Sequence, residues 1–128
     1  MADAATIEAT ITRYMAAMTA GDGAGWVGCF AADATLEDPV GTEVVIGTDA
    51  LATFFANAHA MADGIAMEPT GPIRVAAGEA AFPFKITTTL GADRFEIPVI
   101  DAMTFDDEGQ ITSMRAFWDM ADMTPVSD

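Results

Sequence analysis

Residues 95–105 read FEIPVIDAMTF, and this stretch sets the pattern for the second half of the chain. Side chains of a β-strand alternate between two faces, so the stretch can be divided into two sets. One face carries Ile97, Val99, Asp101, Met103 and Phe105. Asp101 is the lone ionisable group among large apolar neighbours, and no Lys or Arg lies beside it on that face. A strand with one buried face is therefore expected, with a carboxyl group turned into the core.

The neighbouring sequence predicts more strands of the same kind. Strand-like runs cover 79–90, 93–105 and 110–120, and residues 65–75 form an extended stretch broken by Pro69 and Pro72. Gly91-Ala92 and Asp107-Glu108-Gly109 supply turn residues between the runs. The C-terminal half is therefore predicted to be a meander of long antiparallel strands.

The N-terminal half reads as helical, with one short strand. Residues 4–20 place apolar or aromatic side chains on one helical face, at positions 7, 11, 14, 15 and 18. Asp3 is suited to cap this helix and Gly21 to end it. Asp22 is expected to cap a short second helix that runs through Phe30. Thr48 is expected to cap a third helix, which buries Leu51, Phe54, Phe55 and Ala58 and ends near Asp63-Gly64.

Helices followed by a strand meander are typical of an α+β domain. We expect three N-terminal helices packed on a curved, mostly antiparallel sheet, so that the sheet and helices form a conical pocket. No linker, repeat or low-complexity segment interrupts the 128 residues. The chain is therefore read as a single domain over 1–128.

Composition excludes several classes of function. There are 20 acidic and 5 basic residues, a formal net charge of −15, which disfavours nucleic acids, anionic lipids and phosphorylated substrates. One Cys and one His cannot form a disulfide or a zinc site, and no acidic cluster has ligand-like spacing, so no metal is expected. Without an apolar run of about 20 residues or a signal-peptide pattern, a cytoplasmic protein with no membrane partner is expected. Neutral, apolar ligands remain compatible with this charge.

The segment LEDPVG, residues 36–41, contains a second inward carboxylate. If the residues before Pro39 form a strand, Ala34, Leu36 and Asp38 share one face, and the apolar pair takes Asp38 toward the core. A strand-end aspartate that caps a turn is the simple alternative. For Asp101 the simple alternative is a buried carboxylate bound by backbone amides. The functional interpretation is that Asp101 stays protonated, because burial raises the pKa of a carboxyl group, while Asp38 acts as a base.

Tyr14, the only tyrosine, lies on the buried stripe of the first helix. Most tyrosines at such positions are core aromatics. Together with the two inward aspartates, however, it forms a group of three polar side chains that could act in one reaction. One carboxylate can accept a proton from carbon, and two neutral donors can stabilise the resulting oxyanion. This set suits proton abstraction beside a ketone on an apolar substrate.

The sequence resembles the ketosteroid isomerase family, which belongs to the nuclear-transport-factor-like α+β cone superfamily. The matching stretches are ITRYMAAMTAGD (11–22), CFAADATLEDPVG (29–41), GTDALATFFANA (47–58), EAAFPF (79–84) and VIDAMTFDDEGQITSMRAFW (99–118). The resemblance covers almost the whole chain and is weakest over 59–73.

The resemblance implies roles for the marked residues. It places the general base at Asp38, the oxyanion tyrosine at Tyr14 and the protonated aspartate at Asp101. It implies isomerisation of a 3-oxo-5-ene steroid to the 4-ene, without a cofactor, in a homodimer. We expect four aromatic side chains to line the steroid site: Phe54, Phe82, Phe84 and Trp118. At the positions of Phe30 and Phe55, several relatives have tyrosines that belong to a hydrogen-bond network with the catalytic tyrosine. The resemblance therefore implies the same reaction, but it does not fix the catalytic rate.

Two other classes of function remain open at this stage. One is a different enzyme on the same cone, such as a polyketide cyclase or an epoxide hydrolase, the latter requiring an inward arginine between acids. The other is a binder of apolar ligands without catalysis. Four residues receive no catalytic role: His59 as a surface or satisfied helix-end residue, Cys29 as a buried hydrophobe, Arg115 as a structural cation and Glu37 as an outward, solvated acid.

Overall fold

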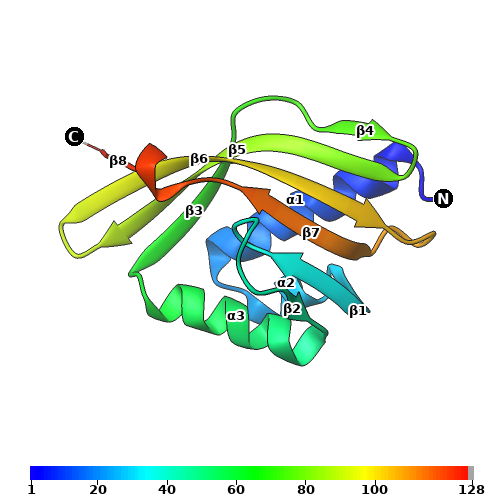
Figure 1. The fold of residues 1–128 in the computed structure, drawn as a ribbon, viewed down its shortest axis with the longest axis horizontal. Coiled ribbons are helices and arrows are strands. Elements are labelled where there is room, and N and C mark those ends of the chain that lie inside the picture. The colour runs from blue at the N-terminus through cyan, green and yellow to red at the C-terminus, as the bar shows by residue number, and fades with distance from the viewer. Residues whose placement is uncertain (127–128) are drawn as a thin grey trace.

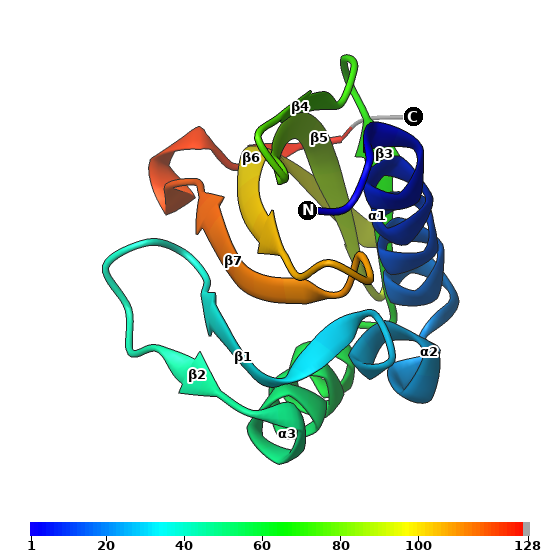
Figure 2. The same ribbon diagram turned by 90° about the vertical axis from the view of Figure 1, so that its right-hand side faces the viewer.

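The computed structural model describes residues 1–126 and shows three helices packed on one curved sheet (Figures 1 and 2). The helices are α1 (Ala4–Ala20), α2 (Gly23–Val27) and α3 (Thr48–Ala60), with a 3-10 turn, η1 (Met120–Asp122). The strands are β1 (Phe30–Glu37), β2 (Val45–Ile46), β3 (Gly64–Pro69), β4 (Arg74–Ala76), β5 (Glu79–Leu90), β6 (Asp93–Phe105), β7 (Ile111–Phe117) and β8 (Thr124–Pro125). The predicted α+β class is confirmed.

The sheet is mixed, with one parallel pair. Its main order is β2-β1-β7-β6-β5-β3, while β4 pairs with β5 and β8 pairs with β6. Among the strands of residues 1–126, only the β1–β7 pairing is parallel, and it joins the N-terminal and C-terminal halves of the chain. Figure 2 shows the strands curving around an interior that α1 and α3 border on two sides. The sheet does not close, so the fold is an open cone.

The ends of α1 follow the expected capping chemistry. The Asp3 Oδ1 atom accepts a hydrogen bond from the Thr6 N–H at 2.8 Å, and Gly21 leaves the helix with a φ of 69°. Positive φ is a region that glycine enters without steric cost. Between the caps, α1 buries one stripe: Ile7, Thr10, Ile11, Tyr14, Ala17 and Met18. The boundaries 4–20 are those expected from the periodicity.

Four boundary predictions were wrong. The second helix ends at Val27 instead of continuing through Phe30, which begins β1, because an apolar residue after a short helix fits either element. Thr48 is the first residue of α3 and makes no capping bond, and Gly47 occupies the cap position. This helix ends at Ala60, before Asp63-Gly64, and β7 ends at Phe117 instead of residue 120.

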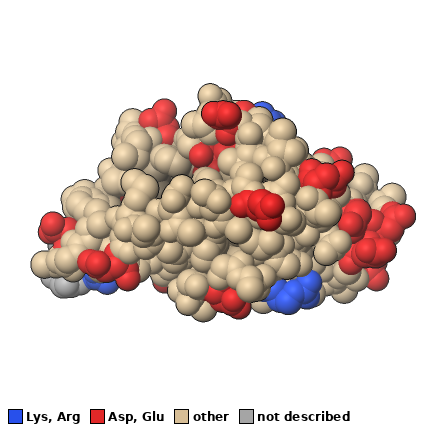
Figure 3. Space-filling model, turned by 90° about the horizontal axis from the view of Figure 1, so that it is seen from below, with Lys and Arg blue, Asp and Glu red and all other residues tan. Residues whose placement is uncertain are grey.

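Acidic groups dominate the charged part of the surface. Figure 3 shows the face on the α3 side, where large uncharged areas are interrupted by acidic side chains that gather most densely at one end. Basic side chains are few on this face. Within residues 1–126 the structure contains no helix with the length and apolar character needed to cross a membrane.

His59 connects the last turn of α3 to the end of α1. Its Nε2 atom lies 2.9 Å from the Met18 carbonyl oxygen, and its Nδ1 atom lies 3.1 Å from the Phe55 carbonyl oxygen. The imidazole also stacks on the Phe55 ring, with 4.1 Å between centroids. Of the two placements expected for this residue, surface or satisfied, the structure shows the second, and His59 ties two helices together.

We predict that His59→Ala lowers the free energy of unfolding by about 1–2 kcal/mol, since it removes this link and part of the ring stacking. Urea unfolding of the variant measures the loss. Asn57→Ala, at an exposed position of the same helix, is the matched control and should change stability by less than about 0.5 kcal/mol. Equal losses in both variants would contradict the assigned link.

Candidate active site

Asp101 lies in the middle of β6 with its side chain in the core. Strand pairing places Phe82 of β5 and Ala116 of β7 directly opposite it on either side. The residue is 1% exposed, and neither carboxyl oxygen has a hydrogen-bond partner in the structure. The alternative of a carboxylate bound by backbone amides is therefore not what the structure shows.

Asp38 follows the last residue of β1 and faces the same interior. Its strand neighbours Ala34 and Leu36 are 0% and 1% exposed, as the alternation predicted, and Asp38 itself is half-buried. The Trp118 Nε1–H donates a hydrogen bond to Asp38 Oδ1 at 2.6 Å. The chain just after it is held to β7, because the Val40 N–H donates to the Ala116 carbonyl at 2.8 Å. Ala116 is the residue opposite Asp101, so β7 lies between the strand that Asp38 follows and the strand that carries Asp101.

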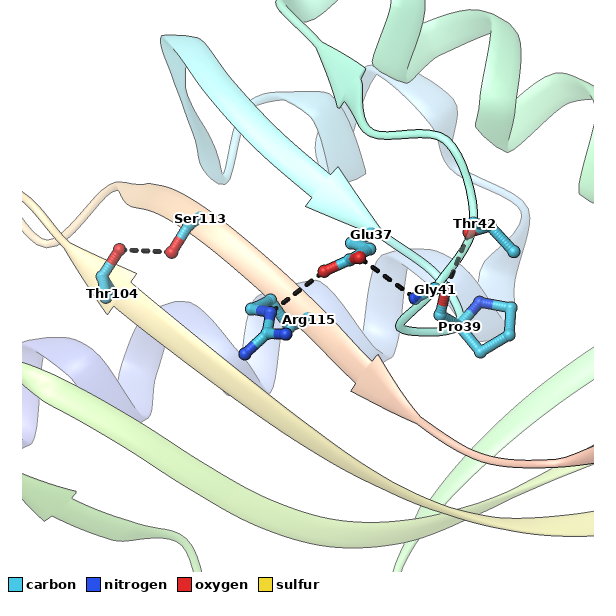
Figure 4. Close-up of polar contacts among 7 residues, drawn as sticks. All are labelled: Glu37, Pro39, Gly41, Thr42, Thr104, Ser113 and Arg115. Carbon is cyan, nitrogen blue, oxygen red and sulfur yellow. Dashed lines mark hydrogen bonds and ion pairs between the residues drawn. The ribbon is translucent and has the colours of Figure 1, made fainter.

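Glu37 fixes the outer side of the same turn (Figure 4). Its Oε1 atom accepts a bond from Arg115 Nε at 3.0 Å, and its Oε2 atom accepts one from the Gly41 N–H, also at 3.0 Å. Thr42 Oγ1 closes the turn by donating to the Pro39 carbonyl at 2.7 Å. The expectation of a merely solvated Glu37 was incomplete, because the carboxylate clamps the loop that carries Asp38. Arg115 has the expected structural role.

Tyr14 reaches the interior from α1. It is 2% exposed and packs against Trp26 and Phe30, with ring centroids 5.8 and 6.1 Å away. Burial is the first cause that raises the pKa of Tyr14 well above its usual value, followed by the charges of Asp101 and Asp38. The hydroxyl group therefore stays protonated and available as a hydrogen-bond donor at neutral pH.

The two aspartates have different electrostatic surroundings. Burial first, then the charge of Asp38, raises the pKa of Asp101 well above its ordinary value. Burial also raises the pKa of Asp38, but the bond from Trp118 acts in the opposite direction. Hydrogen bonding from Tyr14 acts to lower the pKa of Asp101, although neither Asp101 oxygen has a partner of regular geometry. We regard the two groups as neighbours that are not yet bonded, since catalytic hydrogen bonds commonly tighten when a substrate binds.

The three polar groups differ in their surroundings. Environments that push the pKa values of two carboxyl groups apart are the usual basis for assigning acid and base roles. Asp38, which accepts a bond from an indole N–H, is the group better suited to be ionised. Asp101 and Tyr14 are the groups suited to donate hydrogen bonds while neutral.

Of the four aromatic residues expected to line a ligand site, Phe82 lies opposite Asp101 and Trp118 contacts Asp38. Phe82 and Phe84 are 1% and 2% exposed on the inner face of β5, with ring centroids 5.6 Å apart. Trp118 holds Asp38 directly, a contact that the sequence did not indicate. Phe54 is half-buried and stacks on Trp26 at 6.2 Å. Trp26 itself was missed, because a single tryptophan in a five-residue helix produces no periodic signal.

The surface has two hollows whose walls do not include Tyr14, Asp38 or Asp101. One of about 580 Å³ lies on the outer side of the sheet, along β4 to β7. The other, of about 490 Å³, lies between β2 and α3 and includes Phe54 in its wall. Neither is lined by Tyr14, Asp38 or Asp101. Their burial and mutual electrostatic influence, rather than the size of a cavity, mark these groups as a candidate site.

Comparison with known proteins identifies the family. Residues 11–114 match the family model of the SnoaL-like domain. The chain belongs to the SnoaL-like domain family. Two proteins of similar sequence and one solved structure are similar to this chain over most of its length.

The Steroid Delta-isomerase of Nocardioides simplex is 43% identical over 119 residues, which cover 93% of this chain and 94% of that protein. Epoxide hydrolase LasB of Streptomyces lasalocidi is 32% identical over 116 residues, covering 86% of this chain and 40% of that protein. A solved structure of SalBIII, an epoxide hydrolase/cyclase-like enzyme with a role in pyran ring formation in polyether salinomycin, superimposes with a TM-score of 0.88. That structure is 30% identical and covers 98% of this chain and 100% of its own. The resemblance to ketosteroid isomerase and the cone fold are both confirmed.

The raised pKa of Asp101 generates a prediction about stability and pH. Between the ordinary pKa of an aspartate, about 3.9, and the raised value, the unfolded chain releases a proton that the folded chain keeps. Folding stability therefore falls as the pH rises through this window, at up to about 1.4 kcal/mol per pH unit for this one group. Asp101→Asn keeps the shape of the side chain but cannot ionise, so it should lack this loss.

Urea unfolding at several pH values from 4 to 8 measures the effect. We expect the variant to gain stability relative to the unmodified protein as the pH increases, and the two to be most alike near pH 4. A constant difference across the range would mean that Asp101 ionises in the folded protein as it does in water.

Proposed function

We propose that this SnoaL-like domain is a cofactor-independent steroid Delta-isomerase. The reaction would move the double bond of a 3-oxosteroid from the 5-ene to the 4-ene position. The proposal rests on buried Tyr14, buried Asp101 and half-buried Asp38, which interact electrostatically, in a chain 43% identical to a Steroid Delta-isomerase over nearly its full length. We propose further that residues 1–128 act as a single cone domain.

In the proposed mechanism, Asp38 is the general base. Its carboxylate removes a proton from carbon 4 of the steroid, and the electrons move onto the carbonyl oxygen to form a dienolate. Tyr14 and protonated Asp101 donate hydrogen bonds to that oxygen, where negative charge develops. Asp38 then returns the proton to carbon 6, so that no external acid, base or oxidant is consumed. The clamp of Glu37 and the bond from Trp118 hold the carboxylate in place between the two steps.

The surroundings of the site suit a neutral and apolar ketone. Phe54, Phe82, Phe84 and Trp118 would contact the steroid rings, and the net charge of −15 does not oppose an uncharged substrate. Apolar walls also keep water from the oxyanion, which strengthens the hydrogen bonds made there.

The direct test is conversion of 5-androstene-3,17-dione, followed by the ultraviolet absorbance of the conjugated enone. We predict turnover by the unmodified protein and a loss of at least about 10²–10⁴-fold in kcat for Asp38→Asn, because the amide cannot accept the proton. Tyr14→Phe should lose about 10²–10³-fold as one oxyanion donor is removed. Steroid binding without turnover in every form of the protein would make it a binder and defeat the proposal.

A second candidate is an epoxide hydrolase or cyclase, since LasB and SalBIII are described in those terms. Epoxide opening on this cone was expected to need an inward arginine between acids. No arginine is fully buried within residues 1–126, and Arg115 points outward to Glu37. The same protein incubated with an epoxide bearing a neighbouring hydroxyl group distinguishes the candidates, because hydrolysis or ring closure without steroid turnover would support the second.

We also propose a homodimer that pairs the outer faces of two sheets. Ile100 of β6 and Phe117 of β7 are opposite one another on the outer face, 51% and 45% exposed, which is unusual for large apolar side chains in the middle of a sheet. Members of the resembled family are commonly homodimers, so a second copy is the proposed occupant of this face.

We predict that Ile100→Lys converts a dimer to a monomer, because two buried ammonium groups without partners would oppose association. Light scattering after size exclusion measures the mass. Met61→Lys, at a position 78% exposed beyond α3, is the control and should leave the dimer intact. A monomeric unmodified protein would refute the dimer.

A further inference from the structure

Trp26 carries a buried donor without an acceptor. It lies in α2, has 0% exposure, and its Nε1 atom has no hydrogen-bond partner in the structure. Buried indole N–H groups normally find a partner, because leaving one unpaired is unfavourable. Within residues 1–126, the two carboxyl oxygens of Asp101 are the other buried side-chain polar atoms without a hydrogen-bond partner. Tyr14 connects the two places, because it packs against Trp26 and interacts electrostatically with Asp101.

The aromatic neighbours of Trp26 leave one side chain able to accept its hydrogen bond. Phe30, Phe54 and Phe55 surround the indole, with ring centroids 4.7, 6.2 and 5.2 Å away, and none of them has a polar atom. Tyr14 lies 5.8 Å away, its ring plane tilted by 36° from the indole plane. Of these four rings, it alone bears an oxygen.

We propose that Trp26 is a positioning residue for Tyr14, donating its indole N–H to the phenol oxygen while the phenol O–H donates to the substrate oxyanion. The second half of this statement rests on the proposed isomerase function. A phenol hydroxyl can accept and donate at the same time. A chain of hydrogen bonds polarises its members, so a donor behind Tyr14 strengthens the bond in front of it.

The electrostatics of Tyr14 agree with this assignment. Burial and the two aspartate charges raise its pKa, whereas hydrogen bonding from Trp26 acts to lower it. A donor with a less raised pKa forms a stronger bond to an oxyanion, so Trp26 offsets part of the effect of burial. In this assignment Trp26 lies behind Tyr14 and does not itself touch the substrate.

The first test does not depend on catalysis. The chain has two tryptophans, so a ¹H–¹⁵N spectrum contains two indole resonances, which Trp118→Phe assigns. Tyr14→Phe retains the aromatic ring and removes only the hydroxyl group. We expect it to shift the Trp26 resonance by at least about 0.3 ppm in the proton dimension and to leave Trp118 in place. Asp38→Asn is the matched control and should move the Trp118 resonance instead, since Trp118 donates to Asp38.

The second test is a double-mutant cycle on steroid turnover. Trp26→Phe should lower kcat by roughly three- to tenfold with little change in KM, as expected for one neutral hydrogen bond. In a Tyr14→Phe background the same substitution should have almost no effect, because the phenol oxygen is gone. Phe30→Leu, which loosens packing on Trp26 without removing its N–H, should cost the same factor in both backgrounds.

Two results would overturn the inference. One is a Trp26 resonance that Tyr14→Phe leaves unmoved, and the other is an equal loss of kcat for Trp26→Phe in both backgrounds. Absence of any steroid turnover would count against the proposed function, whereas the spectrum would still decide whether Trp26 binds Tyr14. The two failures are therefore distinguishable.

Discussion

A carboxyl group in the apolar interior is the constraint on which the rest of this structure depends. Asp101 is enclosed by β5, β6 and β7, and neither of its oxygens has a partner. An ionised carboxylate in such a place loses its hydration without compensation, so the neutral acid is favoured. The fold thus raises the pKa of this carboxyl group, at a cost in stability that a hydrophobic residue would not carry.

The surrounding elements place complementary groups against this acid. Helix α1 presents Tyr14, Asp38 directly follows β1, and the Val40–Ala116 bond ties that turn to the strand position opposite Asp101. Each side chain is held from behind: Asp38 by Trp118, its loop by Glu37, and Tyr14, by our inference, by Trp26. Side chains held this way are preorganised, and preorganised polar groups are a main source of electrostatic stabilisation in enzymes.

Local patterns predicted much of the fold. The bounds of α1, β5 and β6 followed from periodicity between clear cap and turn residues, and the inward placement of Asp38 and Asp101 followed from alternation. Pairing could not be predicted in the same way. The parallel β1–β7 contact and the bond between Asp38 and Trp118, 80 residues apart, arise only in the folded chain. The two-residue strands β2 and β8 are too short to show any period.

The central claim is that Asp101 is protonated while Asp38 is ionised at neutral pH. Infrared difference spectroscopy measures this directly, because a protonated carboxyl group has a carbonyl stretch that a carboxylate lacks. We expect such a band at pH 7 in the unmodified protein and in Asp38→Asn, and its loss in Asp101→Asn. A spectrum without the band, or one that loses it in Asp38→Asn alone, would contradict the assignment of base and donor.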